Sequence, residues 1–128
     1  MWLSEKAGAA GSLPDAAVET GKVSIGGKSP AVILDGERRN LGVMGYGGLA
    51  WIPKAEQEAI VLHCGDGMDV VAGIMEAPPS DMLPGEIFIS TGAASLYVRA
   101  NGQVNITGSV NITGGLTVNG IPVTGLPL

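Results

Sequence analysis

The C-terminal quarter of the chain repeats one pattern of apolar and polar residues every six positions. Within each hexad the apolar residues alternate with polar ones, which is the period of a β-strand and puts the apolar side chains on one face. These apolar residues are Val104, Ile106, Val110, Ile112, Leu116 and Val118. A glycine follows each short run and permits a bend there. We therefore expect corners at Gly102, Gly108, Gly114 and Gly120.

Hexapeptide periods are typical of β-solenoids, in one chain or in several. Four hexads make little more than one turn of a single-chain solenoid, whereas repeat proteins need about three stacked units to bury a continuous core. Three chains wound about a common axis would bury the apolar residues and pair the free backbone groups. The pattern therefore favours a homotrimeric, intertwined β-helix with the six apolar residues as its core. The alternative is that the hexads form two ordinary hairpins in one sheet.

Upstream of the repeat, short β-like runs are separated by turn residues. They cover residues 23–25, 31–34, 40–44, 59–63 and 70–75. Asp35-Gly36 and Asp66-Gly67 are hairpin signals, because glycine accepts the positive φ that tight turns require. Five short strands without helical periodicity describe a small closed barrel of the OB type better than a sandwich. Two further strands, at 86–90 and 95–100, lead into the hexads.

These patterns predict an all-β chain in three parts: an arm at 1–21, an OB-like barrel at 22–80, and a needle with its apex at 81–128. The arm is rich in alanine, glycine and serine. A short helical turn could begin at Ser12 and run through Pro14, Asp15 and Glu19, since proline and acidic residues suit a first turn.

Composition adds two constraints. The chain is 45% hydrophobic but only 4% aromatic, with 21 glycines in 128 residues, so it has few bulky core fillers and oligomerisation would compensate. The formal net charge of −5 argues against nucleic acid as a partner. We find no basic leader and no apolar run of membrane-spanning length, and expect the protein to be made and assembled in the cytoplasm.

Several short motifs resemble catalytic or ligand-binding signatures, but each has a simpler interpretation. Gly26–Ser29 looks like the end of a phosphate-binding loop, yet the first glycine is missing and a proline follows, so we expect a turn. Gly45–Gly48 lacks the third spaced glycine of a dinucleotide site. Glu56 and Glu58 show no sign of converging across a cleft, as glycosidase chemistry needs.

The single histidine and single cysteine are neighbours, His63-Cys64. Adjacent strand residues point to opposite faces, so we expect a buried Cys64 and a histidine on an edge rather than a nucleophile and its base. Residues 66–69 are too few for a calcium loop. Trp51 and Tyr97 are expected to pack in the fold or against a neighbouring protomer. We predict no enzyme activity and no cofactor.

Parts of the chain resemble the phage baseplate spike family, which includes baseplate assembly protein V and the Mu-type spike. The stretch Leu41–Leu62, followed by Gly65-Asp66-Gly67 and by Val70–Gly73, is similar to the barrel of that family. The passage from Pro84-Gly-Glu86 through Leu96–Gly102 into the hexads resembles its join from barrel to β-helix. The resemblance covers roughly residues 22 to 123 and lies in the order of the motifs along the chain.

The resemblance implies a homotrimer on the axis of a contractile tail, in a virion or phage-tail-like particle. Its partners would be the baseplate hub, the tail tube and the target cell envelope. Many family members end in a His-x-His motif that holds an iron, but no histidine follows His63 here. The apex would then be closed by a separate tip protein or by apolar residues. Those residues are Ile121, Val123, Leu126 and Leu128.

Two other classes of function remain. A trimeric stalk of the adhesin type would present the barrel to a saccharide or a partner protein, and a spike differs from it in carrying no receptor domain after the needle. A hexapeptide-repeat acyltransferase shares the period, but it needs many more coils and a catalytic histidine near a coil interface. The sole histidine lies outside the repeat.

Overall fold

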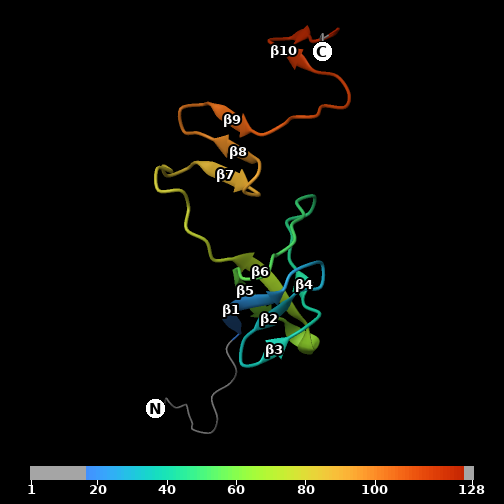
Figure 1. Ribbon diagram of the computed structural model, residues 1–128, viewed down its shortest axis with the longest axis vertical. Coiled ribbons are helices and arrows are strands. Elements are labelled where there is room, and N and C mark those ends of the chain that lie inside the picture. The colour runs from blue at the N-terminus through green and yellow to red at the C-terminus, as the bar shows by residue number, and fades with distance from the viewer. Residues whose placement is uncertain (1–16, 126–128) are drawn as a thin grey trace. The chain divides into compact units, whose positions relative to one another are not determined.

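The computed structural model describes residues 17–125. These residues form an all-β fold whose only helical element is a 3-10 turn at Gly65–Gly67. The chain divides into two compact units between Ala77 and Pro78, called unit 1 and unit 2 below (Figure 1). Within residues 17–125, no helix is long and apolar enough to cross a membrane.

Unit 1 is built on one six-stranded sheet. Neighbouring strands follow the order β3-β2-β1-β5-β6-β4, and every pair is antiparallel except β4 with β6 (Figure 1). The strands are β1 (Val18–Ile25), β2 (Ala31–Ile33), β3 (Glu37–Arg38), β4 (Gly42–Val43), β5 (Glu58–His63) and β6 (Asp69–Ile74). Each of the five strands expected from the sequence is therefore present, and β3 is an addition.

The start of β1 differs from the expectation. The strand begins at Val18, and Glu19 lies opposite Val61 in the ladder with β5. The predicted helical turn therefore does not extend to Glu19. Its other members, Ser12, Pro14 and Asp15, lie outside the described residues.

The sheet curls into a half-barrel and does not close. Its two edges are β3 and β4, which do not pair with each other in the described part of the chain. Both edge strands are only two residues long, too short for a full ladder. Asn40, with φ of 57°, turns the chain between β3 and β4. The Leu41 amide then donates a hydrogen bond to the Pro30 carbonyl at 3.0 Å. The predicted closed barrel is thus only half formed.

The core of unit 1 is small and aliphatic. The fully or nearly fully buried aliphatic residues are Val23, Ala31, Val32, Leu41, Ala59, Val61 and Val71, and all of them except Ala31 form one cluster. Trp51 packs against this cluster, and its indole N–H donates a hydrogen bond to the Met44 carbonyl at 2.7 Å. Packing within the fold, one of the two roles expected for Trp51, is confirmed.

Both predicted hairpin turns are present in unit 1. Asp66 and Gly67 have φ of 65° and 71° between β5 and β6, which is the pair of left-handed residues that a tight hairpin requires. Asp35 and Gly36 lie between the paired strands β2 and β3.

Unit 2 contains a three-stranded antiparallel sheet and a separate two-stranded hairpin. The sheet consists of β7 (Ile87–Ser90), β8 (Ser95–Val98) and β9 (Val104–Thr107), in that order. The hairpin pairs β10 (Thr117–Val118) with β11 (Ile121–Pro122). Both strands expected before the hexads are confirmed, whereas residues 108–116 belong to no strand.

Candidate assembly surface

One face of the unit 2 sheet is entirely aliphatic. The register aligns Ile87, Val98 and Val104 across the three strands, and the next aligned set is Ile89, Leu96 and Ile106. Residues opposite each other in a ladder point to the same side. The other side carries Phe88, Ser90, Ser95, Tyr97, Asn105 and Thr107. The apolar residues of the first hexad are therefore a continuation of an aliphatic surface that begins before the repeat.

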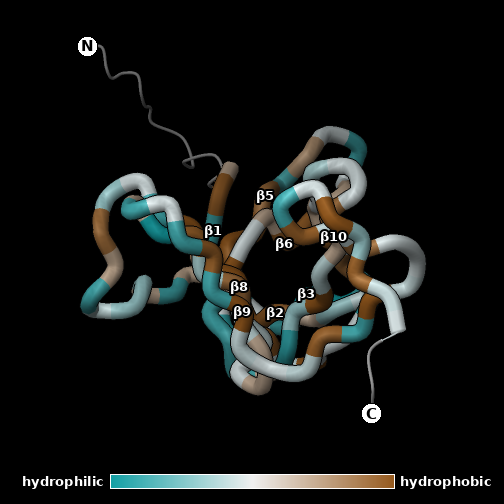
Figure 2. Tube along the Cα trace, turned by 90° about the horizontal axis from the view of Figure 1, so that it is seen from above, coloured by the Kyte–Doolittle hydropathy of each residue, from teal (hydrophilic) through white to brown (hydrophobic). Residues whose placement is uncertain are grey.

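This aliphatic surface is open to solvent in the single chain. On its outer strands the exposed fraction runs from 51% for Ile89 to 58% for Ile106. The apolar residues of the later hexads are exposed as well, from 37% for Leu116 to 56% for Val118. Figure 2 marks apolar residues in brown, and the trace of β8 and β9 carries them. We call the six sheet residues and the four later hexad residues, Val110, Ile112, Leu116 and Val118, the aliphatic stripe. A sheet face that is exposed to water normally carries polar residues. An exposed contiguous apolar surface marks an interaction site.

The glycines of the repeat share one backbone property. Gly102, Gly108, Gly114 and Gly120 have φ of 93°, 127°, 115° and 80°. Residues with a side chain rarely adopt a positive φ, so these positions favour glycine. A positive φ therefore recurs at the same six-residue spacing as the glycines.

The hexads are not joined in one sheet. The first hexad pairs with β8, and part of the third pairs with β11. No ladder connects β9 with β10 within residues 17–125. The alternative of two hairpins in a single sheet is therefore not the arrangement of the described residues. Ile121 of the predicted apex is 68% exposed, Val123 is half-buried, and Leu126 and Leu128 lie outside the described residues.

A buried carboxylate anchors the sheet at the start of β7. The Glu86 side chain is 1% exposed. Its oxygens accept hydrogen bonds from the Ala100 amide at 2.8 Å, the Leu83 amide at 2.9 Å and the Arg99 Nε at 3.0 Å. The amides of Ala100 and Leu83, followed by Arg99, lower the pKa of Glu86 to about 2. The alternation of apolar and polar residues predicted a strand from Glu86, but it gave no sign of this role.

Aromatic packing covers the side of the sheet opposite the stripe. The rings of Phe88 and Tyr97 meet edge to face with centroids 5.1 Å apart, and the Arg99 guanidinium lies 4.3 Å from the Tyr97 ring centroid. The packing role expected for Tyr97 is confirmed. Aromatic and polar residues therefore make up this side, whereas the opposite side carries only aliphatic residues.

In unit 1, His63 lies between two carboxylates. Its Nδ1 is 2.8 Å from Asp69 Oδ1 and its Nε2 is 2.6 Å from Glu19 Oε2, while Arg38 Nη1 is 3.1 Å from the other oxygen of Asp69. The hydrogen bond to Asp69, and then that to Glu19, raises the pKa of His63. The expected edge position was wrong, because β5 lies inside the sheet between β1 and β6.

The expected burial of Cys64 was also wrong. Cys64 follows the last residue of β5 and is exposed. Both nitrogens of its neighbour His63 are engaged by carboxylates.

The remaining short motifs have structural roles. Gly26–Ser29 lies outside the strands, in agreement with the expected turn, and Gly45–Gly48 is part of a loop. Glu56 forms an ion pair with Lys22 at 3.4 Å, and Glu58 is in β5. Among residues 17–125, no three His, Cys, Asp or Glu side chains are grouped to hold a metal ion.

Comparison with protein-family models, curated proteins and solved structures found no match for this chain. The aliphatic stripe is therefore the feature of the chain that bears most directly on its function.

Proposed function

We propose that three copies of this chain wind their C-terminal hexads into a β-helical needle, and that the needle is the central spike of a phage tail or tail-like contractile injection machine. The observation that carries the proposal is the aliphatic stripe: six of its residues are in register from β7 into the first hexad, and its other four residues, in the later hexads, are exposed as well. Sister chains are the partners that suit it best, because a threefold axis brings identical apolar rows together.

Burial of the stripe supplies the driving force for assembly. A fully buried Val, Leu or Ile side chain is worth about 1.5 to 3 kcal/mol, so covering the exposed half of each contributes roughly 1 kcal/mol per residue. Residues 108–116 belong to no strand, and apart from the Leu116 carbonyl, which accepts a hydrogen bond from the Val123 amide, we expect their backbone groups to pair with another chain. Trimerisation would satisfy both the side chains and the backbone of the second hexad.

A spike acts mechanically, and the features of the repeat suit that role. An intertwined β-helix has no open edge along its length, which makes a stiff rod that does not aggregate edge to edge. The net charge of −5 keeps such a rod soluble. In this proposal unit 1 contacts the baseplate hub and tail tube, and the end near Ile121 and Val123 meets the target envelope, alone or beneath a separate tip protein.

Immunogold electron microscopy of tail-like particles from the producing cell tests the role as a spike. An antibody against the chain should label the baseplate end of each particle. Label along the sheath, at the opposite end, or only on free protein would contradict the proposal, even if the chain is a trimer.

A further inference from the structure

Unit 1 contains a cavity of about 610 Å³ with a concentration of positive charge. Its lining comes from the loop after β1, from β3 and the segment leading to β4, and from the turn between β5 and β6. Lys28, Arg38 and Arg39 are three of the seven lysines and arginines of the chain. In a protein of net charge −5, such clustering needs a reason.

Each of these cations retains the capacity to bind an anion. Arg38 uses Nη1 on Asp69, and Arg39 uses Nε on Glu37 at 2.7 Å. A guanidinium has five N–H donors, so most of them remain free. Lys28 is exposed and forms no ion pair within residues 17–125. Among the described residues, the lining contains three cations and one acidic residue, Asp69. The lining therefore carries a net positive charge.

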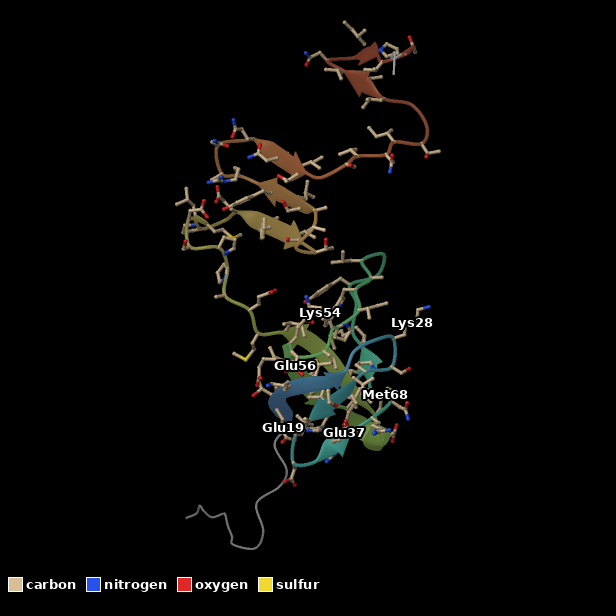
Figure 3. The ribbon with its side chains drawn as sticks, viewed as in Figure 1. Glu19, Lys28, Glu37, Lys54, Glu56 and Met68 are labelled. Carbon is tan, nitrogen blue, oxygen red and sulfur yellow. The ribbon has the colours of Figure 1, made fainter. Side chains whose placement is uncertain are left out.

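The uncharged lining suits a molecule larger than a simple anion. Ser29 and Asn40 offer a hydroxyl and an amide, and Leu41 and Met68 offer apolar contact. Figure 3 shows Lys28 and Met68 on the same side of unit 1. Sites for small organic ligands measure about 300 to 1,000 Å³, and this volume lies within that range.

We propose that this cavity binds a phosphorylated sugar. Lys28, Arg38 and Arg39 hold the phosphate, since arginine matches phosphate geometry with paired N–H donors. Ser29 and Asn40 bond the sugar hydroxyls. The ligand is either a free sugar phosphate or the phosphorylated saccharide headgroup of a lipid. The proposal goes beyond the role of a spike and does not depend on trimerisation, because the cavity lies within unit 1.

Isothermal titration calorimetry of the full chain tests the proposal with glucose 6-phosphate, inorganic phosphate and glucose. We expect saturable binding of glucose 6-phosphate, weaker binding of inorganic phosphate, and none of glucose. Lys28→Ala should weaken binding about tenfold, the effect of losing one charge-assisted hydrogen bond. Lys54→Ala is the matched control, because Lys54 is exposed in unit 1 but does not line the cavity.

Co-sedimentation with phosphatidylcholine vesicles, with and without lipid A, separates the two sources of ligand. Binding to glucose 6-phosphate and to lipid A vesicles supports a lipid headgroup, and binding to the soluble ligand alone supports a free sugar phosphate. Binding to neither, equal binding of glucose and glucose 6-phosphate, or equal effects of Lys28→Ala and Lys54→Ala would overturn the proposal.

Discussion

Leu96 on β8 lies directly opposite Ile106 on β9 in the antiparallel ladder. This pairing locks the first hexad to the strand before it and extends one aliphatic face across both. Ile89 on β7 lies opposite Leu96 in turn. The first hexad of the repeat is therefore the continuation of an apolar surface that starts at β7.

Ile112→Asp should abolish assembly. The substitution would place three carboxylates together on a dry axis, where the charged form is strongly disfavoured. Asn111→Asp is the matched control, because Asn111 precedes Ile112 in the same hexad and alternates to the opposite face. Light scattering should report a monomer for the first variant and a trimer for the second. A trimer for both would remove Ile112 from the core.

Gly114→Ala should destabilise the assembled protein by about 1 to 2 kcal/mol per chain, because an L-residue is strained at positive φ. Gly114 has φ of 115°, whereas the adjacent Gly115 is not in that region, and neither has an atom near its added Cβ. Gly115→Ala is therefore the control and should change the free energy of unfolding by less than about 0.5 kcal/mol. Guanidinium denaturation measures both, and equal losses would contradict the corner role.

Glu86→Gln should lower the unfolding temperature by a few degrees at about pH 7. The pKa of Glu86 is lowered from 4.5 to about 2 in the fold, so its charge stabilises the fold above pH 4.5. That contribution is lost as the pH falls through about 2. The difference between the variant and the parent should therefore shrink in acid. Glu76→Gln is the control, since Glu76 is exposed. Circular dichroism across this pH range measures the effect, and a constant difference would contradict the account.

His63 should titrate above its ordinary pKa of 6.5, because Asp69 and Glu19 stabilise the imidazolium. A raised pKa means that the stabilisation is complete below pH 6.5 and is lost as the pH rises through the pKa of the folded state. The chain has one histidine, so its imidazole proton resonance can be followed by NMR without assignment. Asp69→Asn should lower the midpoint more than Glu19→Gln does. A midpoint at or below 6.5 in the parent would contradict the geometry.

Alternation and turn chemistry were enough to predict most of the strands. Asp66-Gly67 was identified as a turn because few other pairs accept two positive φ angles, and the apolar alternation of the repeat predicted the strand β9. These are local properties of the sequence, so they can be recognised without the structure.

The start of β1 was missed for a long-range reason. Gly21 counts as a strand breaker in sequence, but a Cβ at this position would lie 2.0 Å from the Ile33 carbonyl oxygen, so only glycine fits in the strand there. Glu19 looked like an N-terminal helix residue, yet its carboxylate binds His63, which is distant in sequence. Neither contact leaves a local signal.

Glu86 was missed for a similar reason. Its role depends on the amides of Leu83 and Ala100 converging on one carboxylate, and only the folded sheet brings them together. The acidic residue after Pro84 and Gly85 was visible in the sequence, but its burial was not. The half-barrel likewise depends on β3, an edge strand of two residues that the sequence pattern did not indicate.

The solution mass of the purified chain, measured by light scattering, tests the central claim most directly. The account predicts a single species of three times 12.9 kDa that persists on dilution. A species of 12.9 kDa would mean that the exposed apolar rows of β7, β8 and β9 tolerate water, and the needle would have to be abandoned.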